Sequence, residues 1–220
     1  MLNSKKIITP TPPRGMRDHL PQQLVFRQKI IDALKHVFEL HGFLPLETPA
    51  LERLETLSGK YGEEGDKLMF LVLKRGAELG RALGEVGTKS NPAGILCDQG
   101  LRYDFTVSLA RVMAQFASQL PDPFKRYQIG PVWRADRPQL GRYREFTQCD
   151  VDIVNGDSPQ ADAEIVQLVC DGYAELEKQF QFPEWVLQIN DRRLLSAFNL
   201  VCGNRLDQFA SFCTALDKLD

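Results

Sequence analysis

The sequence predicts an α+β fold, with an antiparallel β-sheet flanked by helices. Residues 126–153 show the alternation of a long β-hairpin, whose two strands must pair antiparallel. Strand and helix patterns do not alternate as the βαβ units of a parallel sheet do. The 220 residues could form one large domain or two small ones, and a hydrophobic content of 43% is ordinary for a globular protein.

Several shorter elements are predicted before the hairpin. Apolar residues recur at helical spacing over residues 24–41, where Pro21 suits the first turn and Gly42 suits the end of a helix. The remaining predictions are a strand at 43–48, a short helix at about 51–57, a surface excursion or irregular hairpin at 74–99, a strand at 101–105, and a helix at 106–119 that directs Val107, Ala110, Met113, Ala114 and Ala117 inward.

The second strand of the hairpin has two different faces. Its odd positions, from Tyr143 to Ile153, are mostly apolar. Its even positions, from Arg142 to Asp152, carry two cations, an aromatic ring, an amide and two carboxylates. Because alternate side chains of a strand point to opposite faces, we expect the odd face to pack on a core and the even face to hold a ligand.

After the hairpin, Ser158 and Pro159 form a helix-start signal for a helix that extends to about Phe180. A strand is predicted at residues 185–189, and the rest of the chain is predicted to be helical.

Composition excludes several classes of protein. A net charge of −2 means that any contact with nucleic acid must come from a local patch. No apolar run is long enough to cross a bilayer, and the first 15 residues lack the apolar stretch of a signal peptide. Five widely spaced cysteines without a CxxC pair predict reduced thiols in a cytoplasmic protein, and three histidines without ligand spacing predict no metal site.

The even face predicts a ligand that has an anionic, a flat and a cationic part. Arg134 and Arg142 flank the turn and could clamp phosphate oxygens. Phe146 could stack on a base, while Gln148 and Asp152 could hold an amino group. Phosphate, ring and ammonium in this order match the layout of an aminoacyl-adenylate.

Two alternatives need no ligand. Arg142 and Arg144 could form a solvated, salt-bridged face with Asp136 or Glu145. Asp104, two residues before Thr106, could simply cap the helix that follows.

Several motifs resemble those of histidyl-tRNA synthetases, a family of class II aminoacyl-tRNA synthetases. GPVWRADRPQLGRYREFTQCDVDI resembles motif 2, and the helix at 24–41 followed by LETP resembles motif 1. PPRGMRDHLP resembles the N-terminal signature, LRYDFTV the first amino-acid-binding strand, and INDRRLL with LDKLD the eukaryotic and archaeal-like branch. The resemblance runs from about residue 12 to the end of the chain.

The resemblance implies a role for each matched residue. Arg134 would be catalytic, binding the α-phosphate of ATP and stabilising negative charge, while Arg142 would contact the triphosphate. The other implied roles are adenine stacking by Phe146, histidine binding by Asp104, Thr106, Gln148 and Asp152, and contact with histidine tRNA by Gln139. Mg²⁺ would accompany ATP, with no metal ligands assigned in this chain.

The resemblance also implies a domain organisation and an activity. Residues 1–197 would form the catalytic core and residues 198–220 the start of a truncated helical insertion domain. The second histidine-binding segment, motif 3 and the anticodon-binding domain of the family are not matched, so the chain is expected to carry only part of the active site. The implied function is ATP-dependent activation of histidine and its transfer to tRNA by a homodimer. The alternatives are a histidine-binding regulatory subunit of ATP phosphoribosyltransferase and a non-catalytic interaction module.

Overall fold

The structure, a computed structural model, describes residues 10–58, 68–87, 92–203 and 205–216. The chain divides into two compact units, Met1–Phe180 and Gln181–Asp220, which are described separately. The predicted domain boundary at residue 197 stays a prediction. Most of the LDKLD motif lies outside the described residues.

The first unit begins with the predicted helix, α1 (Pro21–Leu40), which confirms the helical spacing. Gly42 follows with φ of 77°, a conformation that glycine adopts without strain. The strand expected at 43–48 is only β1 (Leu44–Pro45). The helix expected at 51–57 is only α2 (Leu54–Leu57), because residues 51–53 form strand β2 (Leu51–Arg53), which pairs with a later strand.

A small antiparallel sheet has the strand order β2-β4-β3, with β3 at Leu71–Leu73 and β4 at Cys97–Leu101. The strand predicted at 101–105 is therefore wrong in position, since β4 ends where that prediction begins. The surface excursion or irregular hairpin predicted at 74–99 does connect an antiparallel strand pair, β3 and β4, but the prediction missed helices α4 (Gly76–Val86) and α5 (Pro92–Leu96) within it. Gly80 and Gly84 each cost about 1 kcal/mol relative to alanine in a helix, and they obscured an amphipathic pattern that buries Ala82.

The helix predicted at 106–119 is confirmed as α6 (Thr106–Phe116) followed by the 3-10 turn η1 (Ala117–Gln119). Its predicted inward face is largely wrong, since Ala110, Ala114 and Ala117 are exposed. Its buried residues are Val107, Ser108, Leu109 and Val112. Leucine and valine bury more apolar area than alanine, so their positions decide which side of a helix packs inward.

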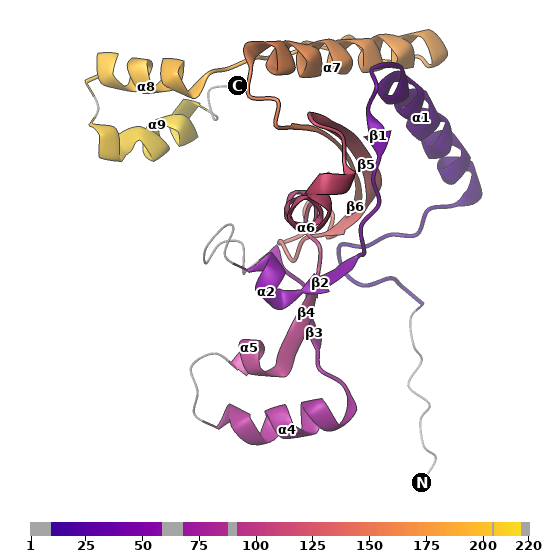
Figure 1. The fold of residues 1–220 in the computed structure, drawn as a ribbon, viewed down its shortest axis with the longest axis vertical. Helices are drawn as coiled ribbons and strands as arrows, with labels where there is room; N and C mark the ends of the chain where they lie inside the picture. The colour runs from indigo at the N-terminus through magenta and orange to yellow at the C-terminus, as the bar shows by residue number, and fades with distance from the viewer. Residues whose placement is uncertain (1–9, 59–67, 88–91, 204, 217–220) are drawn as a thin grey trace. The chain divides into compact units, whose positions relative to one another are not determined.

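The long hairpin is confirmed as β5 (Phe124–Trp133) and β6 (Glu145–Val154), paired antiparallel. The short strand β1 adds to β5 in parallel and gives the order β1-β5-β6. Figure 1 shows the hairpin as a curved ribbon with α6 inside its curve and α1 on its outer side.

The odd face of the hairpin packs on a core with α1 and α7 (Pro159–Gln179) through Val151 and Ile153, as predicted, but Thr147 and Cys149 of the same face are exposed. The Ser158 hydroxyl accepts a hydrogen bond from the Ala161 N–H and caps α7. The buried members of this core are Val37, Phe38, Phe43, Tyr127 and Leu168. The Tyr127 hydroxyl donates to Glu39 Oε1 at 2.7 Å, and burial together with this bond raises the pKa of Tyr127 to about 12.

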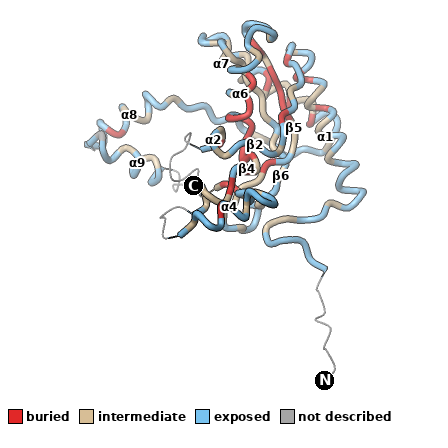
Figure 2. Tube along the Cα trace, turned by 60° about the horizontal axis from the view of Figure 1, so that its bottom comes forward, coloured by how far each residue is buried: buried red, intermediate tan, exposed pale blue. Residues whose placement is uncertain are grey.

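The second unit contains α8 (Arg192–Val201), η2 (Leu206–Gln208) and α9 (Phe209–Leu216), as the prediction of a helical end requires. The strand predicted at 185–189 is wrong. Val186 and Ile189 are 84% and 71% exposed, and the described residues of this unit include no strand that could pair with them. In Figure 2, α8 and α9 are mostly exposed, whereas buried residues gather along β5, β4 and α6. Over the described part of the whole chain, no helix is long and apolar enough to cross a membrane.

Candidate functional site

The even face of the hairpin forms a row of mostly polar side chains, which we call the polar row. Each member on β5 lies directly across from one on β6, in the pairs Arg126–Asp152, Gln128–Asp150, Gly130–Gln148 and Val132–Phe146. At about 3.4 Å per residue, the row extends ~20 Å from Phe146 to Asp152. Arg126 and Gln128 are buried, and the four members on β6 are half-buried. The face is therefore sheltered but still polar.

The segment 102–105 crosses the polar row next to Gly130. The Trp133 N–H donates to Arg102 O at 3.0 Å, and Arg102 Nε donates to Pro131 O at 3.0 Å. A Cβ at Gly130 would lie 3.3 Å from Arg102 Nη2 and 3.7 Å from Phe105 Cζ, so glycine permits this close approach. The crossing brings this segment, which includes Asp104, beside the Gly130–Gln148 pair.

Arg134 and Phe146 lie together at the turn end of the polar row. The Arg134 guanidinium lies 5.2 Å from the centre of the Phe146 ring. Arg134 Nε also donates to Tyr103 O at 3.1 Å. This bond fixes the guanidinium through Nε, and its two terminal nitrogens take no part in it. A flat cation over an aromatic ring is suited to a phosphate beside a base.

Arg142 lies in the turn, because β6 begins only at Glu145. Its Nη2 atom is 2.9 Å from Asp136 Oδ2 and its side chain is 57% exposed, so the salt-bridged alternative is present at this residue. Gln139 and Arg142 pair through their backbones at 3.0 and 3.2 Å. Both side chains thus lie on an exposed loop outside the regular part of the hairpin.

The N-terminal signature contacts this turn. Gly15 O accepts a hydrogen bond from the Arg144 N–H at 2.7 Å, and the Arg17 guanidinium lies 4.0 Å from the centre of the Tyr143 ring. Gly15 has φ of 84°, and a Cβ there would meet Arg144 Cγ at 2.9 Å. Arg144 also donates through Nε to Asp136 O. With these contacts, Arg144 forms no ion pair with Asp136 or Glu145 in the described part of the chain, so the salt-bridged alternative is not present at this residue.

The other end of the polar row combines an amide and two carboxylates with a cation. Gln148 Oε1 is buried and has no hydrogen-bond partner in the described part of the chain. Arg126 is fully buried, and its Nη2 contacts Asp150 Oδ2 at 2.9 Å and also Asp152 Oδ2. Sequence reasoning missed Arg126 and Gln128. The cross-strand pairing of an arginine with an aspartate was the signal that could have found Arg126.

The residues predicted to bind histidine differ in how far they are buried. Asp104 is buried, and its Oδ1 accepts the Thr106 N–H at 3.0 Å, so the capping alternative is also present. Thr106 itself is exposed. This bond fixes one carboxylate oxygen of Asp104 within the segment that passes Gly130.

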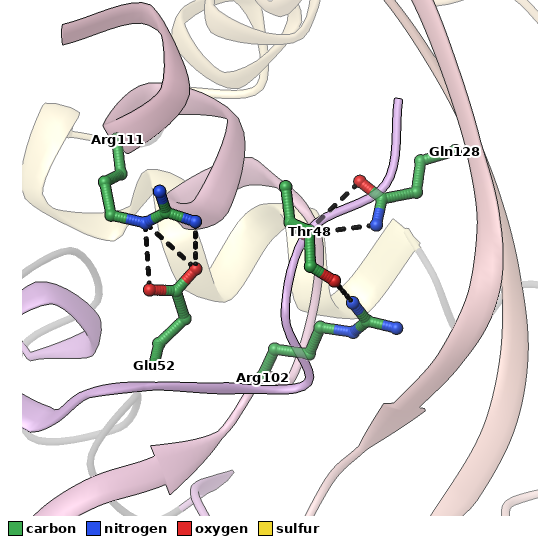
Figure 3. Close-up of polar contacts among 5 residues, drawn as sticks. All are labelled: Thr48, Glu52, Arg102, Arg111 and Gln128. Atoms are coloured by element: carbon green, nitrogen blue, oxygen red, sulfur yellow. Dashed lines mark hydrogen bonds and ion pairs between the residues drawn. The ribbon is translucent and has the colours of Figure 1, made fainter. Parts of the chain in front are cut away.

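A group of buried polar contacts supports the segment that crosses the row (Figure 3). Arg102 Nη1 donates to Thr48 O at 2.5 Å, and Gln128 Nε2 donates to Thr48 Oγ1 at 3.1 Å. A separate ion pair in Figure 3 joins Arg111 of α6 to the buried Glu52 of β2 at 2.8 Å. Burial lowers the pKa of Arg102, against the opposing effect of nearby carboxylates. These contacts give Arg102 a structural role.

Comparison with known proteins identifies the family. The model of the family described as Histidyl-tRNA synthetase matches residues 98–217, more than half of the chain. The chain belongs to the histidyl-tRNA synthetase family. The resemblance found in the sequence is thereby confirmed, and the class II catalytic fold with it.

Curated relatives and solved structures agree with this family. The chain is 43% identical to the histidine–tRNA ligase of Gloeobacter violaceus, over 94% of this chain and 44% of the relative. It is 42% identical to that of Porphyromonas gingivalis, over 96% and 46%. The chain therefore spans about half the length of these relatives.

The histidyl-tRNA synthetase from Nostoc sp. PCC 7120 matches with a TM-score of 0.71 and 26% identity, over 97% of this chain and 44% of that one. A Bacillus halodurans structure, titled as an ATP phosphoribosyltransferase regulatory subunit/histidyl-tRNA synthetase, matches with a TM-score of 0.60 over 78% and 39%. At 24% identity it supports the fold alone.

Proposed function

We propose that this chain supplies the ATP- and histidine-binding face of a histidine–tRNA ligase, which activates histidine with ATP and transfers it to histidine tRNA. The observation that carries the proposal is the polar row, where an arginine over an aromatic ring is followed by an amide and an acid on one sheltered face. The curated relatives, named histidine–tRNA ligase, favour this activity over that of a regulatory subunit.

ATP would bind at the turn end of the row. Phe146 would stack on adenine, and the guanidinium of Arg134 would turn from the ring to the α-phosphate. A cation held there before the reaction would stabilise the charge that develops as the histidine carboxylate attacks. Arg142 would exchange its exposed pair with Asp136 for the triphosphate, and Mg²⁺ would be bound with ATP.

Histidine would bind along the rest of the row. Asp104 and Gln148 would hold its ammonium group, with Thr106 fixing Asp104 through the backbone bond at 3.0 Å. Asp152 would accept a hydrogen bond from the imidazole. The buried Gln148 Oε1 supports this placement, because a buried acceptor without a partner costs stability unless a ligand satisfies it.

The partners follow from the same proposal. Gln139, on the exposed loop, would approach the acceptor end of histidine tRNA in the cytoplasm. A homodimer would cover apolar side chains of α1, since Leu24 and Val25 are 42% and 59% exposed and line a pocket that also includes Ile129 and Pro131.

Titration of the chain with a non-hydrolysable histidyl-adenylate analogue tests the proposal, with the seryl analogue as control. Selective binding of the histidyl analogue is expected. Equal binding of both, or binding of neither by a folded chain, would contradict a histidine site on this face.

A further inference from the structure

Arg126 connects two carboxylates at the inner end of the polar row. Asp152 lies directly across the hairpin from it, and Asp150 lies one pair further toward the turn. Both carboxylates contact the same nitrogen, Nη2, and the arginine side chain is fully buried whereas those of Asp150 and Asp152 are 26% and 34% exposed. The cation is therefore fully buried within the row, whereas the two carboxylates are partly exposed.

Stability alone does not account for this arginine. Its Nε and Nη1 atoms are buried and have no partner among the residues that the structure describes. Burying a guanidinium carries a large desolvation cost, and an apolar side chain of similar volume is often at least as stabilising as a buried ion pair. The same face of β5 also buries an apolar residue, since Val132 is fully buried. The presence of a charged residue at position 126 is therefore best explained by its contacts with the two carboxylates.

We propose that Arg126 is a positioning residue that makes this end of the row selective for a side-chain ring carrying an N–H donor. One cation and two carboxylates leave the group of Arg126, Asp150 and Asp152 with a single net negative charge. Held in place by Arg126, the Asp152 carboxylate would present an acceptor to the ring N–H. A ring without a donor could not form this hydrogen bond, so an analogue of similar shape would bind more weakly. The inference rests on the proposed function, because it assumes that the histidine side chain reaches Asp152.

The net charge of the group formed by Arg126, Asp150 and Asp152 makes this inference testable. Removing Arg126 leaves two carboxylates in one sheltered place, where like charges favour a shared proton and a weaker acceptor. Removing one carboxylate leaves a neutral group. Removing both the arginine and one carboxylate restores a single negative charge. Asp150→Asn should therefore weaken binding when Arg126 is present and strengthen it when Arg126 is absent.

The experiment titrates the chain and its variants with two non-hydrolysable adenylate analogues, one histidyl and one thienylalanyl, whose ring has no N–H. Arg126→Met should weaken the histidyl analogue about 10- to 100-fold, the range for a hydrogen bond to a charged group, and change the thienylalanyl analogue less than about threefold. Asp150→Asn should weaken the histidyl analogue about 10-fold, and Arg126→Met/Asp150→Asn should recover at least half of the logarithmic loss caused by Arg126→Met.

Arg111→Met is the matched control, because it breaks another sheltered arginine–carboxylate pair, with Glu52, away from Asp150 and Asp152. It should leave the ratio of the two affinities unchanged. If Arg126→Met does not fold, Asp150→Asn alone tests the inference. An Asp150→Asn chain with the same ratio of histidyl to thienylalanyl affinity as the wild type would overturn it. The wild type could prefer the histidyl analogue while Arg126→Met and Asp150→Asn both keep this preference. That result would overturn the inference about Arg126 but would leave the proposed function standing. A wild-type chain without preference overturns both.

Discussion

The two faces of the β5–β6 hairpin differ in what their side chains contact. The odd face packs Tyr127 and its apolar neighbours on α1 and α7. The even face buries charged and amide side chains beneath a segment that the Gly130 backbone allows to pass close by. Alternate side chains of a strand point to opposite faces. One pair of strands can therefore place core residues on one face and ligand-binding residues on the other. Substitutions on the odd face should change the free energy of unfolding, and those on the even face should change ligand affinity.

The largest expected effect is on the odd-face core. Phe43 is 1% exposed, so Phe43→Ala should lower the free energy of unfolding by about 3–5 kcal/mol through lost burial and a cavity. Urea denaturation followed by circular dichroism measures it. Phe146→Ala, an equal truncation on the even face, should cost clearly less, since Phe146 is only half-buried. Equal losses would show that the two faces do not differ in this way.

The Tyr127–Glu39 bond makes the stability of the odd face depend on pH. The pKa of Tyr127 is raised in the folded chain to about 12, above its ordinary value of 10.0. Its contribution is therefore complete below pH 10 and decreases toward pH 12, as the unfolded chain loses the proton first. A shift of this size corresponds to about 2–3 kcal/mol.

The measurement is the difference in free energy of unfolding between the wild type and Tyr127→Phe, from pH 9 to 12. The advantage of the wild type should decline over that range. A difference that stays constant with pH would show that Tyr127 is not held protonated by the fold.

On the even face, Arg134→Ala should weaken binding of the histidyl-adenylate analogue about 10- to 100-fold, as expected for losing a charge-assisted hydrogen bond to phosphate. The free energy of unfolding should change by less than about 1 kcal/mol. Calorimetric titration and urea denaturation give the two quantities. Arg137, an exposed arginine of the same turn, provides the control, and Arg137→Ala should leave affinity unchanged. Equal effects of the two changes would remove the specific role of Arg134.

The smallest effect concerns the exposed Arg142–Asp136 pair. Exposed ion pairs contribute little, so Arg142→Gln and Asp136→Asn should each change the free energy of unfolding by less than about 0.5–1 kcal/mol. If Arg142 serves the triphosphate, only Arg142→Gln should weaken ATP binding. Matching ATP affinities in the two variants would favour the solvated salt bridge as its whole role.

The sequence predicted the elements with long, regular patterns. Helices α1 and α7 and the β5–β6 hairpin were confirmed because many residues repeat one period in each. The strand at 185–189 failed because a short apolar run shows only that a segment could pair, and the described residues nearby offer it no partner strand. Helix α4 was missed because its glycines broke the pattern on which helix prediction depends.

The candidate site was predictable along one strand only. Alternation on β6 placed Phe146, Gln148 and Asp152 on one face, and their proposed roles came from the family resemblance. Arg126 and Gln128 were missed because they belong to the site through the register between β5 and β6. Register depends on the geometry of the intervening turn, and a shift of one residue would have placed both on the other face.

The most direct test of the central claim, that the even face holds the aminoacyl-adenylate, is a crystal structure of the chain with the histidyl-adenylate analogue. Adenine should lie against Phe146, the phosphate at Arg134, and the imidazole at the Asp152 carboxylate held by Arg126. An analogue bound elsewhere, or one whose imidazole points away from Asp152, would contradict it.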